Sequence, residues 1–225
     1  MAMPQSAPPT FAGEFETHVT VDCDEMGLVR VSTWADQAGI KLTHIMLSRG
    51  RVRSQPMLTL TGTGTLPEQR DFAAAIVRDL NSAGFRATRV KVEAAPWNIG
   101  VPQHDASALR LGEEFYFEHH VKLALGAGTD LEALAALAIP HGAHLSWNAR
   151  RRLPSGGDER FVTQRCHGVG LFRASSLLKN LCDELRERGY QILSAVQEFV
   201  VFDSDATLDA GWIEQVQPIA SPALP

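Results

Sequence analysis

The chain has few cysteines and little positive charge. Its 225 residues include three cysteines, Cys23, Cys166 and Cys182, and no C-x-x-C pair. An odd number without that spacing argues against a disulfide framework and against a thiolate zinc site. Lys and Arg number 21 against 26 Asp and Glu, for a formal net charge of −5 at pH 7. Nucleic-acid binders and proteins held on anionic membranes need a basic surface, so we expect neither partner.

The sequence also lacks a long apolar run. The longest, LEALAALAIP at 131–140, is too short to span a bilayer, and the N-terminal residues lack the basic and apolar segments of a signal peptide. Because the cysteine usage fits a reducing compartment, we expect a cytoplasmic protein. Both ends are rich in Pro and Ala, which predicts flexible tails over 1–11 and 206–225.

What the sequence does contain is a repeat. FETHVTV at 15–21 returns as FEHHVKL at 117–123, with Phe, Glu, His and Val in the same four places. Such self-similarity indicates two copies of one structural unit. Later matches, 100 to 106 residues apart, pair Thr43-His44-Ile45 with Ala143-His144-Leu145, Gly62-Thr63-Gly64 with Gly168-Val169-Gly170, and Glu93 with Glu198.

Each copy is predicted to read strand, helix, strand, strand, helix, strand. Apolar alternation indicates the strands, and capping boxes at 65–68 and 129–132 predict two of the helix starts. This order is that of the ferredoxin-like β-α-β-β-α-β unit. We therefore predict an α+β fold of two tandem ferredoxin-like repeats with antiparallel sheets, at 12–95 and 113–205, joined by a linker at 96–112.

The polar residues of these strands are predicted to share one face. Helices of a ferredoxin-like unit cover one side of its sheet, and alternate residues of a strand point to opposite sides, so the apolar residues should lie under the helices. We expect the two open faces to pack together or to join edge to edge, forming a shared polar cleft. The residues assigned to the open faces are Glu16, His18, Thr20, His44, Ser48, Thr59, Thr61 and Glu93 in the first repeat, and Glu118, His120, Lys122, His144, Ser146, Asn148, Thr163, Arg165, His167 and Glu198 in the second.

The first chemistry that these residues suggest is anion binding. Gly62-Thr63-Gly64 and Gly168-Val169-Gly170 each leave a strand and approach a helix start, where free N–H groups favour phosphate or carboxylate. Basic residues lie on the neighbouring hairpins. The expected ligand is a small anionic molecule, with a phosphate-bearing one as the first expectation. The predicted ligand-binding residues are His44, His144, Arg49, Arg150, Arg151, Lys122, Glu93 and Glu198.

A short motif adds a reaction to this expectation. His18-Val19-Thr20-Val21 resembles the His-x-Thr-hydrophobic motif of the two-histidine phosphoesterases, in which two such motifs act on a phosphodiester. The second copy reads His120-Val121-Lys122-Leu123, with Lys where that family has Ser or Thr. The resemblance implies hydrolysis or transfer at a phosphoester with His18 and His120 as acid and base. In that reaction Glu16 and Glu118 would orient the two histidines.

Two alternatives stay open. Glu-x-His on a strand puts a carboxylate and an imidazole on one side, so Glu16 and His18, with His44 or Glu93, could bind a metal, and the second repeat has the same residue types. In a noncatalytic regulatory or interaction module, the buried Glu and His residues would instead pair across the repeats, because burying them unpaired is costly. Whether the protein is an enzyme, which cofactor it uses and whether it forms a homo-oligomer are also left open.

Overall fold

The predicted strand and helix pattern forms in both halves of the computed structural model, which describes residues 9–150 and 157–213. The helix starts follow from their sequences. Thr65 and Glu68 form the predicted capping box of α2, whereas α4 is capped by Asp130 and not by the predicted Thr129, because the Asp130 carboxylate accepts from the N–H groups of Glu132 and Ala133. The first half contains β1 (Ala12–Asp22), α1 (Glu25–Ala38), β2 (Lys41–Leu47), β3 (Ser54–Thr65), α2 (Leu66–Ser82) and β4 (Arg86–Ala94).

The second half repeats this order after a short connecting helix, and a further single-turn helix follows its last strand. Both halves therefore read β-α-β-β-α-β, and the predicted class, α+β with two ferredoxin-like repeats, is confirmed. These elements are α3 (Asp105–Leu111), β5 (Tyr116–Leu125), α4 (Leu131–Ala138), η1 (Ile139–His141), β6 (Ala143–Asn148), β7 (Asp158–His167), α5 (Leu171–Glu187), β8 (Gln191–Asp203) and η2 (Ala206–Asp209).

The two sheets join edge to edge at both ends. The strand order β1-β3-β2-β6-β7-β5-β8-β4 closes on itself as a barrel, with β2 paired to β6 and β4 paired to β8, both antiparallel. Closure leaves none of these eight strands with an unpaired sheet edge. Of the two arrangements expected from the sequence, the edge-to-edge one occurs, and it brings both open sheet faces into the barrel interior.

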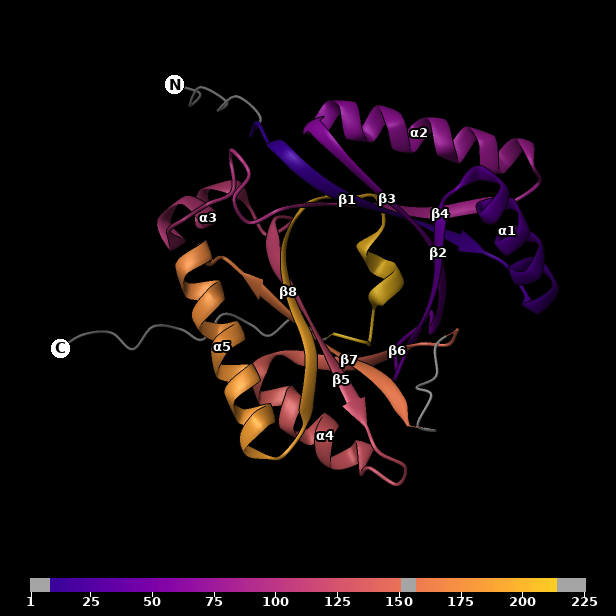
Figure 1. Ribbon diagram of the computed structural model, residues 1–225. Coiled ribbons are helices and arrows are strands. Elements are labelled where there is room, and N and C mark those ends of the chain that lie inside the picture. The colour runs from indigo at the N-terminus through magenta and orange to yellow at the C-terminus, as the bar shows by residue number, and fades with distance from the viewer. Residues whose placement is uncertain (1–8, 151–156, 214–225) are drawn as a thin grey trace, which may run out of the picture.

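The helices cover the outside of the barrel (Figure 1). Three apolar clusters lie between helices and strands: one around Val31 and Leu80, one around Leu134 and Leu181, and one around Phe117 and Phe199 where β4 meets β8. The apolar cores are thus outside the ring of strands, so the polar face of every strand has to be accommodated inside it. No helix in the described ranges is long and apolar enough to cross a membrane.

Several segments that the sequence predicts to be tails or linker are packed. Phe11 is fully buried, and the predicted linker contains α3, in which Ala108 is buried. The largest correction concerns residues 206–213, which the sequence assigns to a flexible tail. There η2 lies inside the ring of strands (Figure 1), with Leu208, Asp209 and Trp212 buried. The reason is that the barrel interior supplies polar partners for this segment, which no local pattern reveals.

The outer cores predict a large cost for truncating one of their leucines. Leu181 is fully buried, so Leu181→Ala should lower the free energy of unfolding by about 2–5 kcal/mol, measured by urea denaturation. Leu109 is 70% exposed, and Leu109→Ala should change the free energy of unfolding by less than about 0.5 kcal/mol. Equal effects of the two substitutions would contradict this placement of the core.

Candidate functional site

Alternate residues of β4 are charged, and their side chains point into the barrel interior. Val90 and Val92 belong to or pack against the outer cores, so Arg89, Lys91 and Glu93 point inward. The register places Glu93 opposite Glu16 of β1, and Lys91 opposite His18. The interior therefore receives acidic, basic and imidazole groups at neighbouring positions.

In the first repeat, His18 lies between two glutamates. Its Nε2 atom is 2.9 Å from Glu93 Oε2 and 3.3 Å from Glu16 Oε1. Its Nδ1 atom is 3.3 Å from Thr59 Oγ1 on the adjacent strand β3. The ring is thus held from both nitrogens.

The second repeat builds the same set. His120 Nε2 is 3.3 Å from Glu118 Oε1 and 3.7 Å from Glu198 Oε2, and Nδ1 is 3.1 Å from Thr163 Oγ1. Glu-x-His of the first strand, Thr of the third strand and Glu of the last strand therefore recur in both halves.

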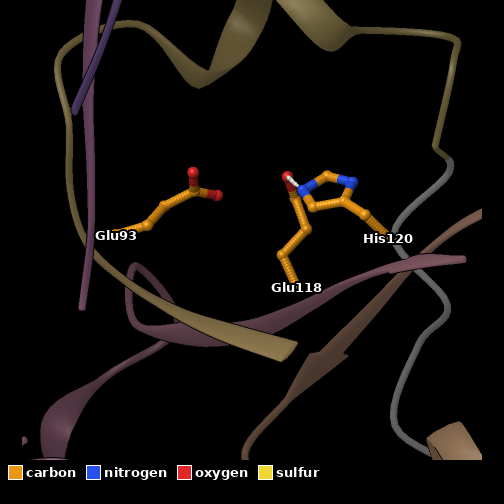
Figure 2. Close-up of side chains that lie close together, drawn as sticks. All are labelled: Glu93, Glu118 and His120. Carbon is orange, nitrogen blue, oxygen red and sulfur yellow. Dashed lines mark ion pairs between the residues drawn. The ribbon is translucent and has the colours of Figure 1, made fainter. Parts of the chain in front are cut away.

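The two sets meet inside the barrel. Lys91 Nζ lies 2.8 Å from Glu93 Oε1 and 2.6 Å from Glu118 Oε1, so one ammonium bridges a carboxylate from each repeat. Figure 2 shows the Glu93 carboxylate pointing toward Glu118 and His120. One ligand-type atom from each of these three residues lies within 4.8 Å of the other two. We call the six residues Glu16, His18, Glu93, Glu118, His120 and Glu198 the Glu–His cluster.

An ionic chain continues from this cluster to η2. Arg165 Nε is 2.5 Å from Glu118 Oε2, and Arg165 Nη2 is 2.6 Å from Asp209 Oδ2. Arg89 contacts Asp209 at 3.0 Å and Asp203 at 2.5 Å. Buried charges are retained only when they are paired, and here the pairs link both repeats and the C-terminal segment.

The pairing divides the cluster carboxylates into two kinds. Burial acts to raise the pKa of Glu93, but Lys91 and His18 outweigh it and bring that pKa to about 2. The pKa of Glu118 is likewise held well below its usual range, because Arg165 and Lys91 outweigh burial. Burial, reinforced by the charge of Glu93, raises the pKa of Glu198 to about 8. Near neutral pH Glu198 therefore holds a proton.

His120 also favours its protonated form. Burial opposes the imidazolium, but the contact with the Glu118 carboxylate outweighs it and raises the pKa of His120. The cluster thus keeps protons on side chains that lie among carboxylates.

A pocket of about 460 Å³ opens beside the cluster. Its lining includes the carboxyl-bearing residues Glu14, Glu16, Glu93 and Glu198, with Trp97 and Thr61, and contains no Lys or Arg of the described chain. Glu93 is fully buried, and neither of its oxygens accepts a well-directed hydrogen bond from a described residue. Its two short contacts are ion pairs with Lys91 and His18, which leaves lone pairs for a further partner.

Several residues predicted to bind the ligand lie elsewhere. Arg150 is exposed and bonds to Ser32, Lys122 pairs with Glu159 at 3.7 Å, and Arg151 lies outside the described residues. His144 does face the interior, where Arg49 Nη2 is 3.3 Å from its Nδ1, but both belong to the surroundings of η2 and not to the Glu–His cluster.

His44 corrects the predicted face of β2. The register pairs Lys41 with Thr59 and Leu42 with Leu58, so His44 shares the outer face with Leu42, and its Nε2 lies 2.8 Å from Ser54 Oγ. Alternation alone assigned the opposite face, because β2 carries apolar residues on both sides.

The two helix starts predicted to bind an anion already contact carboxylates of the chain. Glu68 accepts a hydrogen bond from the Thr65 N–H at 2.7 Å, and Asp105 accepts one from the Gly170 N–H at 2.8 Å. The favourable position for negative charge at each helix start is therefore used within the fold.

Sequence reasoning missed Lys91, Arg89 and Asp209. The first two share the parity of Glu93 in RVKVE at 89–93, and three charged residues at alternate positions of one strand are a readable signal. Asp209 carries no such signal, because it lies far along the chain from the arginines that it contacts.

Neither a family model nor a curated protein matches the sequence. Among solved structures, the acetolactate synthase small subunit from Thermotoga maritima is 11% identical, with 84% of this chain and 95% of that chain covered and a TM-score of 0.28. A mutant chlorite dismutase from Candidatus Nitrospira defluvii is 12% identical (84% and 91% covered, TM-score 0.29). The regulatory subunit of aspartate kinase from Thermus thermophilus is also 12% identical (77% and 93% covered, TM-score 0.30). At these TM-scores the likeness supports no argument about this chain, and the fold assignment rests on its own order and pairing of strands.

Because the Lys91 ammonium bridges two buried carboxylates, we expect Lys91→Met to destabilise the fold strongly. Removing the ammonium leaves Glu93 and Glu118 buried next to each other, so the free energy of unfolding should fall by about 3–5 kcal/mol in urea denaturation. Adding Glu93→Gln should recover part of that loss. Lys41 is exposed on β2, and Lys41→Met should change stability by less than about 0.5 kcal/mol. A Lys91→Met variant as stable as the wild type would contradict the bridge.

The raised pKa values predict that stability falls as the pH rises. Glu198 has a pKa of about 8 in the folded chain against an ordinary value of 4.5, so the folded state binds this proton more tightly, and the advantage is lost between those values. His120, raised above 6.5, acts in the same direction. Urea denaturation should show a loss of roughly 1–3 kcal/mol between about pH 6 and about pH 8.

The control for this pH effect is a comparison of two Glu→Gln variants. Glu198→Gln cannot titrate and should flatten the profile above about pH 6. Glu187 is exposed on α5, and Glu187→Gln should keep the wild-type profile. A Glu198→Gln profile as steep as that of the wild type would show that other groups cause the dependence.

Proposed function

We propose that this chain is a ligand-binding protein, and that the Glu–His cluster binds a divalent cation, alone or together with a small phosphate-bearing molecule coordinated to it. The observation that carries the proposal is the convergence of four carboxyl groups and two imidazoles, from both repeats, beside an acidic pocket. Carboxylate oxygen and imidazole nitrogen are the usual ligands of Zn²⁺ and Mn²⁺ in proteins. Glu93, Glu118 and His120, with ligand atoms within 4.8 Å, form the core of the proposed site.

The charge balance of the cluster supports a cationic ligand. Two cationic side chains of the described residues contact its four carboxyl groups, Lys91 at Glu93 and Glu118 and Arg165 at Glu118, and protons on Glu198 and His120 offset further negative charge. A divalent cation entering from the pocket would replace these protons. Binding should therefore release protons and become tighter as the pH rises.

A cation would also make an anionic ligand compatible with the acidic lining. A free phosphate would be repelled by the carboxylates of Glu16 and Glu93, which line the pocket, whereas the positive charge of a coordinated metal would offset this repulsion. Divalent metals held by one or two carboxylates commonly complete their coordination with substrate phosphates. The small anionic ligand expected from the sequence thus belongs to this proposal as the partner of the cation.

The same arrangement suggests how a phosphoester could react. His18 contacts Glu16 and Glu93, which both line the pocket. His120 contacts Glu198, which also lines it, and Glu118. Imidazoles are effective general acids and bases near neutral pH. Hydrolysis or transfer at a metal-bound phosphoester, with these histidines exchanging protons, is the reaction that we would test first.

The test is calorimetric titration of the purified protein with Mn²⁺, Zn²⁺ and Mg²⁺, each with and without inorganic pyrophosphate, at about pH 6 and pH 7.5. At least one cation should bind with saturation, more tightly at the higher pH. Glu93→Gln and His120→Ala should each weaken that affinity by about 10-fold or more, which corresponds to about 1.4 kcal/mol.

Two exposed residues provide matched controls for these variants. Glu187→Gln and His104→Ala remove the same groups from the protein surface and should bind the cation as the wild type does. If no cation binds, or if the cluster variants bind as well as these controls, the cluster serves folding alone and the proposal fails.

A further inference from the structure

Three donors from three different strands surround the carboxylate of Asp209. Its Oδ2 atom lies 3.0 Å from Arg89 Nη1 and 2.6 Å from Arg165 Nη2, and its Oδ1 atom lies 3.0 Å from Gln55 Nε2. Arg89 belongs to β4, Arg165 to β7 and Gln55 to β3. We call Arg89, Arg165 and Gln55 the Asp209 cradle. It lies in the barrel interior, toward η2 and away from the pocket end of β4.

We propose that the Asp209 cradle is a second binding site, for the carboxylate or phosphate group of a small molecule, and that Asp209 is its built-in competitor. Guanidinium groups match the geometry of carboxylate and phosphate oxygens. Two of them, with an amide donor, converge here on a single oxyanion. The site does not depend on the proposed cation, because its donors are complete without one.

The donors of the cradle are held in place independently of Asp209. Arg89 makes two further contacts with Asp203, at 2.9 and 2.5 Å, and Arg165 Nε is bound to Glu118. Gln55 Nε2 also donates to the Val52 carbonyl. If Asp209 left, these contacts would keep Arg89 Nη1, Arg165 Nη2 and Gln55 Nε2 directed at the vacated position. A site whose donors are already positioned loses little free energy to reorganisation when it binds.

The segment that carries Asp209 is attached mainly by polar contacts. Leu208 and Trp212 are buried, yet neither belongs to any of the three apolar clusters. The main attachments are hydrogen bonds, such as Arg51 N–H to the Ala210 carbonyl at 2.8 Å and Trp212 Nε1 to the Leu145 carbonyl at 3.0 Å. Displacement of η2 would therefore leave the outer cores intact.

A second observation points to an additional ligand atom in this region. Tyr116 is 5% exposed, and its hydroxyl has no hydrogen-bond partner among the described residues. Its ring lies 5.2 Å from the guanidinium carbon of Arg165. Buried hydroxyl groups are normally paired, so this one is an unused donor beside the cradle. A phosphate group has more oxygens than the Asp209 carboxylate and could accept from it.

The test uses Asp209→Ala in the full chain, with inorganic phosphate and acetate as probes. Thermal shift and calorimetric titration are run with EDTA present, and chloride keeps the ionic strength constant. The variant should melt at a lower temperature than the wild type, and either probe should restore the melting temperature with saturation. Because the wild type already holds Asp209 in the cradle, its affinity for the same probe should be at least 10-fold weaker.

Two further variants complete the test. Asp209→Asn keeps the size of the side chain and removes its charge, and it should also bind the probes more tightly than the wild type. It takes the place of Asp209→Ala in the test if that variant does not fold. Asp36 is exposed on α1, and Asp36→Ala should behave as the wild type. Lack of saturable binding by both Asp209 variants would overturn the proposal, as would equal affinity in the variants and the wild type, which would place the anion elsewhere. EDTA excludes the divalent cation, so failure here is distinct from failure of the proposed function.

Discussion

The contact on which the interior depends is the ammonium of Lys91 between Glu93 and Glu118. One carboxylate comes from each repeat, and both are almost completely buried. A buried charge without a partner would destabilise the fold strongly, whereas a fully paired group is tolerated. The lysine therefore makes it physically acceptable for two sheets to turn their charged faces toward each other. It also ties the first repeat to the second on the opposite side of the sheet from the outer apolar cores, to which the neighbouring Val92 belongs.

Closure of the barrel is what creates this requirement. A single ferredoxin-like sheet can leave its uncovered face in water, where polar residues need no protein partner. Pairing β2 with β6 and β4 with β8 removes that option. The interior therefore contains a continuous chain of ionic contacts from Glu16 through Lys91 to Asp209. Each charged group in it contacts a group of opposite charge or an imidazole. The polar interior and the apolar exterior cores are thus two consequences of one topology.

The ratio of acidic to basic groups changes along this ionic chain. The interior therefore has two chemically different regions. Along β4, Glu93 lies at the pocket end, Lys91 in the middle and Arg89 next to η2. Carboxyl groups exceed cations beside the pocket, so that region suits a cation. Guanidinium groups gather around Asp209, so that region suits an anion. Glu118 contacts both Lys91 and Arg165, and so connects the two regions electrostatically.

Much of the fold and half of the site could be read from local patterns. The repeated heptads, the alternation of the strands and the position of Glu16, His18, Glu118 and His120 on one face follow from periodicity, because parity along a strand depends on near neighbours alone. The face of His44 could not be read in this way, since the register of β2 against β3 sets it. Lys91 shares the parity of Glu93, but its bridge to Glu118 exists because the sheets close. Asp209 reaches Arg89 and Arg165 across more than 40 residues of sequence, and a pairing of that kind is set by the way the chain folds back on itself, not by any pattern within a segment.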